Sequence, residues 1–228
     1  MYMGLNYQTL LDGVKEYRKF AGSDEAYKKY VLDQRQVWEN LDQISKDDVE
    51  RIIIGFLKAW NIRNVNRISR SCDSLEKALK TLNKHFNVLR GKNLLDIDFN
   101  EKVNIDEHEM KISDVIKEIY KRISEVESVG PTSASKIMHG VIPELFMMWD
   151  EKIRNGYGYA GNEVGYLRFM CEMQRILKNV METYGGEPDD LCHEVYPEMK
   201  KPLTKLLDEF NYMKFTRGEN LPNPIEDC

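Results

Sequence analysis

A short turn around Gly130 and a single aspartate beyond it are the strongest candidates for a reactive site in this chain. The turn reads Val129-Gly-Pro-Thr-Ser133, and Asp150 lies 18 residues after Thr132. The carboxylate of Asp150 can stabilise a developing positive charge or activate a nucleophile. Free backbone N–H groups at a helix start after the turn can bind an anion such as a phosphate. Together they predict a site that binds an anionic group and reacts beside it.

We expect two helices to hold the turn and a third to hold the aspartate. Apolar residues at helical spacing predict a helix from Asp114 to Val126 and another from Ser133 to His139. Gly130 can adopt the positive φ that a tight connection needs, and Pro131 suits the first turn of a helix. Asp150 is expected to cap the short helix that follows it.

This pattern resembles the helix-hairpin-helix DNA glycosylases, a superfamily that includes endonuclease III, the adenine glycosylases and the alkylpurine glycosylases. Their usual motif is Leu-Pro-Gly-Val-Gly-x-Lys/Ser-Thr-Ala, followed at a set distance by an aspartate. This chain reads Val126-Glu-Ser-Val-Gly-Pro-Thr-Ser-Ala134, and Asp150 falls at the matching distance. Glu127 and Ser128 replace the family's Pro-Gly, and Thr132 stands where bifunctional members carry a nucleophilic lysine.

The resemblance implies a base-excision repair enzyme that hydrolyses the N-glycosidic bond of a damaged or mismatched base in double-stranded DNA. Such cleavage passes through an oxocarbenium-like sugar, and Asp150 would be the catalytic residue that stabilises this cation or activates water. A bifunctional enzyme also needs an amine to form a Schiff base, which Thr132 cannot supply. We therefore expect a monofunctional enzyme. Lys136 and Lys152 are alternative amines, but a phosphate contact or a solvated side chain is the favoured interpretation of each.

The hairpin is expected to hold the DNA backbone through N–H groups at the start of its second helix. The residues assigned to this role are Gly130, Thr132, Ser133 and Lys136. The resemblance also implies a monovalent cation, K⁺ or Na⁺, that bridges to DNA. By position, the backbone carbonyls of Ser124, Val126 and Val129 would hold it.

Candidates for the base pocket, or for a wedge that fills the space left by a flipped base, come from two parts of the chain. They are Trp60, Asn61, Arg63, His139, Trp149 and Tyr157. Core packing is the competing interpretation of Trp60 and Trp149, because buried aromatic side chains dominate helical cores. For His139, a hydrogen-bonded core histidine is the favoured interpretation.

The cysteines lack the spacing of a metal site. Cys72, Cys171, Cys192 and Cys228 are scattered singly, so we expect free and mostly buried thiols. The iron–sulfur loop of some endonuclease III relatives is absent from the sequence. No zinc-binding cluster or glycine-rich nucleotide loop is visible either, so no cofactor is predicted beyond the monovalent cation.

Charge is distributed unevenly along the chain. The net charge is −5, yet residues 51–92 carry +8, which leaves −13 for the remainder. The ten basic residues of this segment are Arg51, Lys58, Arg63, Arg67, Arg70, Lys77, Lys80, Lys84, Arg90 and Lys92. Phosphate binding requires a local basic face, so the segment is a predicted DNA contact. The alternative is a solvated helical face with acidic neighbours from elsewhere in the fold.

Periodicity predicts an all-α fold. Helices are expected over most of the 228 residues, including one from Ser23 to about Leu41, with irregular or short extended pieces between Gly91 and His108. An apolar content of 42% suits a soluble protein, and no membrane-spanning run or secretory signal is visible. We therefore expect an intracellular monomer without membrane contact.

The resemblance further implies two helical lobes with a cleft between them. A central lobe would span residues 46–135, and a second lobe would combine residues 1–45 with residues 136–228. The hairpin and Asp150 would then face each other across the cleft.

A second function remains open: a non-catalytic helix-hairpin-helix protein that binds nucleic acid, or a helical interaction protein. Asp150 discriminates between the two functions, because a binding module has no need of a carboxylate at that distance. An enzyme is expected to place Asp150 at the floor of an open cleft with the basic face at its rim. A buried Asp150 without a cleft would favour the alternative.

Overall fold

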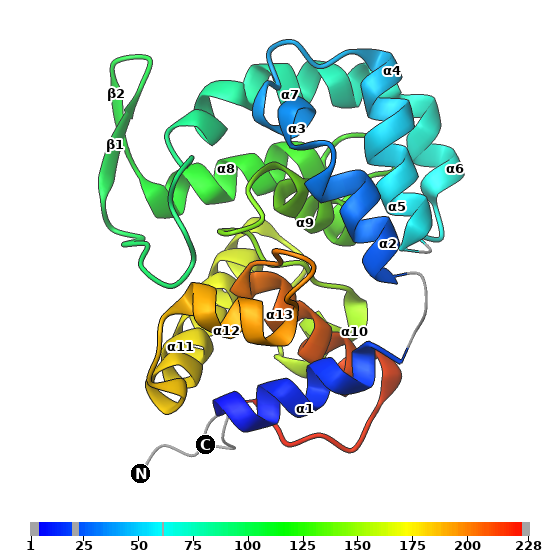
Figure 1. Cartoon of the computed structure of the whole chain (residues 1–228). Coiled ribbons are helices and arrows are strands. Elements are labelled where there is room, and N and C mark those ends of the chain that lie inside the picture. The colour runs from blue at the N-terminus through cyan, green and yellow to red at the C-terminus, as the bar shows by residue number, and fades with distance from the viewer. Residues whose placement is uncertain (1–4, 20–22, 61, 225–228) are drawn as a thin grey trace.

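The computed structural model describes residues 5–19, 23–60 and 62–224, and this part of the chain is predominantly helical (Figure 1). The α-helices are α1 (Tyr7–Tyr17), α2 (Ser23–Tyr27), α3 (Arg35–Glu39), α4 (Lys46–Asp48), α5 (Gly55–Ala59), α6 (Val65–Ile68), α7 (Cys72–Asn87), α8 (Ile112–Ser124), α9 (Gly130–Val141), α10 (Glu151–Gly156), α11 (Glu163–Tyr184), α12 (Pro188–Val195) and α13 (Leu203–Asn211). The π-helical segments η1 (Lys28–Leu32), η2 (Val49–Ile54) and η4 (Tyr212–Arg217) and the 3₁₀ turn η3 (Ser69–Ser71) extend neighbouring helices. The predicted helical fold class is confirmed.

One β-hairpin interrupts the helices. Strands β1 (Lys102–Ile105) and β2 (His108–Lys111) pair antiparallel, with Lys102 opposite Lys111. Asp106 and Glu107 connect them with φ values of 48° and 66°, which suits the right-handed twist of a two-residue hairpin turn. The hairpin extends away from the helices and follows the irregular segment expected before it (Figure 1).

The helices form two groups in space. In Figure 1, α2 to α9 lie in the upper group, while α1 and α10 to α13 lie in the lower group. Helices α2 and α3 contact α5 and α9, so residues 23–39 pack beside the predicted central lobe. The division into lobes at residues 46 and 135 stays a prediction.

Helices α8, α9 and α11 build the core that positions the site. Helix α8 buries Ile112, Val115, Ile116, Ile119 and Ile123 on one side, which is the amphipathic spacing of a surface helix. Helix α9 is buried on every side from Ser133 to Val141. None of the described helices combines the length and apolar composition that crossing a membrane requires.

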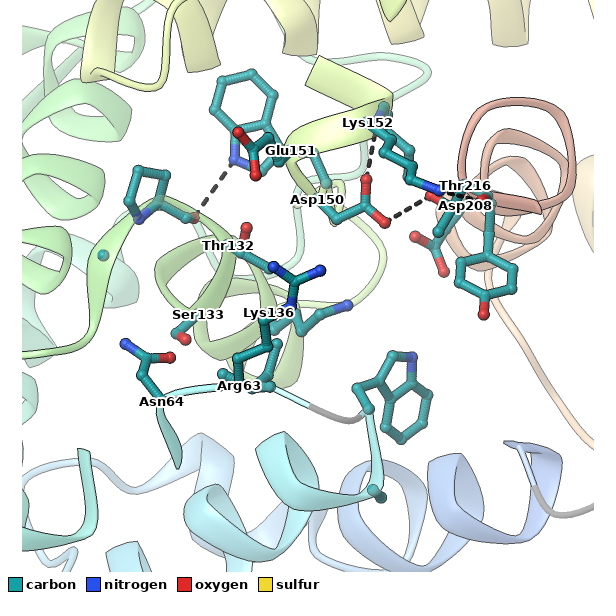
Figure 2. A pocket seen from close by; sticks show the side chains of 18 of the residues that line it. Arg63, Asn64, Thr132, Ser133, Lys136, Asp150, Glu151, Lys152, Asp208 and Thr216 are labelled. Carbon is teal, nitrogen blue, oxygen red and sulfur yellow. Dashed lines mark hydrogen bonds between the residues drawn. The ribbon is translucent and has the colours of Figure 1, made fainter. Parts of the chain in front are cut away.

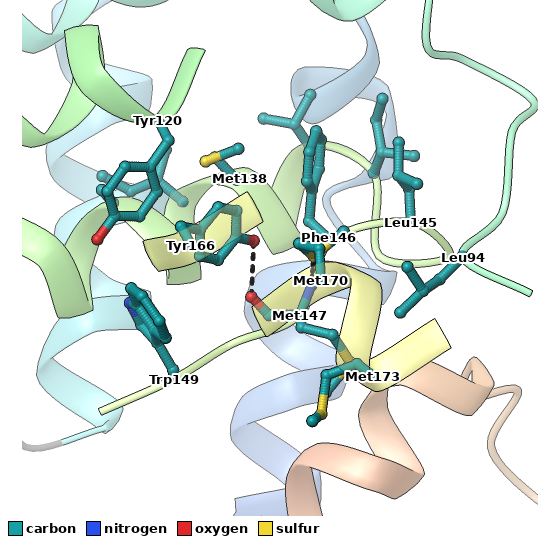
Figure 3. Close-up of a cluster of buried hydrophobic side chains, with 14 of the residues drawn as sticks. Leu94, Tyr120, Met138, Leu145, Phe146, Met147, Trp149, Tyr166, Met170 and Met173 are labelled. Carbon is teal, nitrogen blue, oxygen red and sulfur yellow. Dashed lines mark hydrogen bonds between the residues drawn. The ribbon is translucent and has the colours of Figure 1, made fainter. Parts of the chain in front are cut away.

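The irregular segment from Phe146 to Trp149 crosses this core just before Asp150 (Figure 3). Because this buried backbone belongs to no helix or strand, other groups must satisfy its polar atoms. The Tyr166 hydroxyl donates to the Met147 carbonyl at 2.8 Å, and the Trp149 N–H donates to Ser135 Oγ at 3.2 Å. These bonds fix the point at which Asp150 leaves the core.

Candidate functional site

The connection between α8 and α9 has the conformation expected of the hairpin turn. Gly130 adopts a φ of 66°, which confirms the predicted positive φ. Ser128 also has a positive φ, 68°, although its Cβ makes this region unfavourable. In the motif that the sequence resembles, this position is a glycine. The side-chain amide of Asn64 donates to the Ser128 carbonyl and ties the turn to the loop after α5.

Helix α9 starts earlier than predicted, at Gly130 instead of Ser133, with Pro131 in its first turn. Gly130, Pro131, Thr132 and Ser133 all line one pocket. Apart from its chain neighbours and the backbone of α9, no atom lies within 4 Å of the place where a Cβ on Gly130 would stand. The start of α9 is therefore open to an approaching group.

Asp150 caps α10, as predicted, and its two carboxylate oxygens have different donors. Oδ1 accepts the Ile153 N–H at 2.8 Å, and Oδ2 accepts the Thr216 hydroxyl at 2.6 Å. The Lys152 ammonium in turn donates to the Thr216 carbonyl at 2.9 Å. Asp150 is half-buried and lines the same pocket as the hairpin turn. Its carboxylate is thus held in one orientation with access to the pocket.

The pocket has a volume of about 890 Å³ and gathers residues from distant parts of the chain. Figure 2 shows Thr132, Lys136, Asp150 and Asp208 around it. Of the predicted site residues, the pocket is lined by Trp60, Arg63, Val129, Gly130, Thr132, Ser133, Lys136, Trp149 and Asp150. Asn61 lies outside the described residues.

Lys136 is not a solvated surface lysine, and that interpretation is corrected. The residue is 7% exposed, because α9 is buried along this length. Its ammonium has no hydrogen bond or ion pair among the described residues, and it lies 5.9 Å from the centroid of the Trp60 ring. Desolvation lowers the pKa of Lys136, while the charges of Asp208 and Asp150 act in the opposite direction. The pocket therefore contains a buried amine.

His139 and Tyr157 do not line the pocket, so their candidate assignment to it is corrected. The favoured interpretation of His139, a hydrogen-bonded core histidine, is confirmed. The His139 ring is fully buried between the Tyr27 hydroxyl, 2.9 Å away, and the Phe146 carbonyl, 2.7 Å away. Burial lowers the pKa of His139 to about 4. The Tyr157 hydroxyl donates to Asn211 Oδ1 at 2.7 Å in the core. Both side chains point inward because buried polar atoms need partners there.

The three carbonyls expected to hold a monovalent cation lie at the hairpin turn. The Val126 carbonyl accepts the Val129 N–H at 3.0 Å. A carbonyl oxygen has two lone pairs, so this bond leaves capacity for a cation. The set of Ser124, Val126 and Val129 stays a prediction.

Sequence patterns missed the contribution of the last helix to the pocket. Asp208, Tyr212 and Thr216 line it from α13 and η4, and Asp208 is 5% exposed. The Lys205 ammonium donates to Asp208 Oδ2 at 2.8 Å, so this carboxylate is neutralised by a buried partner. No motif spacing pointed to these residues, because they reach the pocket only through long-range packing.

Within the described ranges, no group of three or more His, Cys, Asp or Glu side chains could hold a metal ion. Cys72 and Cys192 are buried free thiols, as expected, and Cys171 is an exposed one. Cys228 lies outside the described residues. Compared with protein-family models, curated proteins and solved structures, the chain matches none of them. Site geometry is therefore the basis of the functional proposal.

Proposed function

We propose that this chain is a DNA glycosylase that hydrolyses the N-glycosidic bond of a damaged or mismatched base in double-stranded DNA. The observation that carries the proposal is the shared pocket of the hairpin turn and Asp150. The open start of α9 can bind a backbone phosphate, because its first N–H groups lack helical acceptors. Asp150 then lies beside the sugar of a nucleotide that is flipped into the pocket.

In the proposed reaction, the bond between the sugar C1′ and the base nitrogen breaks, and its electron pair leaves with the base. The sugar becomes an oxocarbenium ion, and the Asp150 carboxylate stabilises this positive charge. Water adds to C1′ and loses a proton, which leaves an abasic site in an intact strand. The Ile153 N–H and the Thr216 hydroxyl hold the carboxylate in place during these steps.

Asp150 also separates this proposal from a non-catalytic binding protein. A half-buried carboxylate in the wall of a large pocket supports an enzyme, and a fully buried cap without a pocket would support a binding module. Arg63, from the basic segment, is exposed and lines the pocket. Arg63 therefore supplies a basic side chain of the kind expected at the rim of an enzyme site.

The amine of Lys136 favours a second candidate, a glycosylase that also cleaves the strand. A desolvated lysine that has no hydrogen bond or ion pair among the described residues is a potential nucleophile. Its attack on C1′ would displace the base and, after loss of a proton and ring opening, form an imine. Borohydride trapping tests this step. We expect no trapped complex, because Asp150 is fixed at the sugar and can direct water. A covalent complex that is lost in Lys136→Ala would establish the second candidate.

The experiment that tests the main proposal is base release from duplexes with single uracil, hypoxanthine, 8-oxoguanine, alkylated-purine or mismatch sites. On whichever duplex is a substrate, Asp150→Asn should abolish release and preserve DNA binding. Asparagine is also a good N-cap, so α10 should remain intact. The control is Asp47→Asn, which removes the same charge at an exposed position outside the pocket.

Equal release by Asp150→Asn and the parent enzyme would contradict the catalytic role of Asp150. Absence of release from every duplex, together with DNA binding, would favour the non-catalytic alternative.

A further inference from the structure

The basic segment 51–92 is divided by the fold into a neutralised part and an unpaired part. Four of its cations have carboxylate partners: Arg51 with Asp48, Lys80 with Glu76, Lys84 with Asp106 and Lys92 with Glu101. Arg90 is half-buried and donates to the Trp38 carbonyl at 3.2 Å. These five side chains are already occupied by partners within the chain.

The remaining five cations of the segment are exposed, and none has a hydrogen bond or an ion pair among the described residues. They are Lys58, Arg63, Arg67, Arg70 and Lys77. Four of them fall within 13 consecutive residues around α6, and we call Lys58, Arg63, Arg67 and Arg70 the α6 cation face. The two acidic residues nearest in sequence, Asp73 and Glu76, are paired with Lys46 and Lys80. No ion pair among the described residues therefore neutralises this face.

This face continues into the pocket. Arg63 lines the pocket, and its neighbour Asn64 donates to the carbonyl of Ser128 in the hairpin turn. Arg67 and Arg70 are three residues apart on one helical stretch, so they point to the same side. A polyanion that lies on α6 would thus reach the hairpin and the pocket without a break.

We propose that the α6 cation face binds the phosphate backbone of duplex DNA beside the pocket. The assignment rests on the proposed function and adds the path of the strand that delivers the target nucleotide. Double-stranded DNA has the matching chemistry, because it carries a dense row of phosphates next to each base pair. Unpaired cations release counterions from DNA, whereas the paired ones would first have to lose their carboxylates.

Two triple variants with the same loss of charge test the assignment. One combines Lys58→Ala, Arg67→Ala and Arg70→Ala, and leaves Arg63 in the pocket untouched. The matched control combines Arg51→Ala, Lys80→Ala and Lys84→Ala. The dissociation constant of each is measured against NaCl concentration with an undamaged DNA duplex and with the same duplex carrying one abasic site. Urea unfolding verifies that both variants are folded.

We expect the first variant to lower the magnitude of the salt slope by about 2.7, at about 0.9 for each phosphate contact in B-DNA. Its affinity should be roughly 500-fold lower at 0.1 M salt, and the difference should shrink toward 1 M. The control should keep a slope close to that of the parent protein. Equal slopes or equal losses in the two variants would overturn the assignment.

The outcomes also separate this assignment from the proposed function. If base is still released but the two variants show the same salt slope, the assignment of the α6 cation face is wrong and the proposed function stands. If the salt slopes differ as expected but no duplex releases a base, the proposed glycosylase function is wrong and the assignment of the α6 cation face stands. A first variant that loses affinity for duplex RNA of the same sequence, but not for DNA, would overturn the choice of DNA as the partner.

Discussion

Asp150 is held by one near and one distant donor. The Ile153 N–H is supplied by the helix that Asp150 itself caps, three residues further along. The Thr216 hydroxyl comes from η4, at the far end of the chain. The first donor sets the backbone of the cap, and the second sets the rotation of the carboxylate. Thr216 is therefore a positioning residue for the proposed reaction.

At this scale we predict that Thr216→Val slows base release by about 10-fold to 100-fold, because a hydrogen bond to a charged group is worth roughly 1.5–3 kcal/mol. The effect should fall on kcat, and DNA affinity should be unchanged. Thr216→Ser retains the hydroxyl and should restore the parent rate. A Thr216→Ser enzyme as slow as Thr216→Val would show that the hydroxyl has no positioning role.

At the scale of elements, the hairpin turn keeps its backbone shape with an unfavourable residue. Ser128 adopts a left-handed conformation that glycine would adopt without strain. The bond from Asn64 to its carbonyl joins this turn to the loop after α5 and helps to hold the conformation. The turn is thus maintained by contacts with another element as well as by its own sequence.

We predict that Ser128→Gly raises the free energy of unfolding by about 1 kcal/mol, because it removes the steric cost of the left-handed conformation. Urea unfolding should show a higher midpoint with an unchanged slope. Ser124→Gly is the matched control. It places glycine at the last residue of α8, in helical backbone, and should destabilise the protein. Destabilisation by both variants would contradict the strain at Ser128.

The stretch from Ser23 to Leu41 shows how side chains can divide a predicted helix. Helices α2 and α3 are separated by η1 and a turn at Asp33 and Gln34. The Trp38 indole N–H donates to the Tyr30 carbonyl at 2.8 Å, so this carbonyl finds a partner outside a regular helix. Trp38 is fully buried. Its burial depends on tertiary packing, which helical periodicity alone does not predict.

His139 joins α9 to α2 and to the segment before Asp150, and it makes this junction sensitive to acid. Its pKa is lowered from 6.5 to about 4 by burial, so the unfolded chain binds this proton before the folded one does. The contribution of the neutral His139 ring to the free energy of unfolding is complete above pH 6.5 and is lost as the pH falls to 4. We predict a loss of roughly 3 kcal/mol between pH 7 and pH 4 from this residue.

Urea unfolding of the parent protein and of His139→Gln at both pH values measures that loss. The variant should be less stable at pH 7, because it loses the ring's hydrogen bonds, but its stability should fall less on acidification. The carboxylates contribute equally to both proteins, so the difference isolates His139. Identical pH dependence would contradict a buried neutral ring.

For the molecule as a whole, few large hydrophobic side chains of the described residues are exposed to a second copy. Among the described residues, Val164 is the exposed large hydrophobic side chain. Stable homodimers usually bury large apolar patches. We therefore predict that sedimentation at micromolar concentration gives the mass of one chain. A dimer that persists on dilution would contradict this prediction.

The pocket itself is a property of the whole molecule. Its walls come from the loop after α5, the start of α9, the cap of α10 and the last turns of the chain. Sequence patterns identified the start of α9 and the cap of α10, and they suggested the loop after α5. They did not identify Asp208 or Thr216, because neither residue belongs to a motif. They also offered Tyr157 as a pocket residue, whereas packing turns it into the core; for His139 they favoured the core position that packing gives it.

Neighbouring residues are enough to specify the local structure of this protein: its helical class, the positive φ at Gly130 and the cap at Asp150. These features depend on residues within a few positions of each other, so their chemistry is readable from spacing. Long-range packing instead buries Lys136, brings Thr216 to Asp150 and gives Lys84 and Arg90 partners from distant parts of the chain. Each depends on residues far apart in the chain, and burial of the apolar helix faces is what brings them into contact.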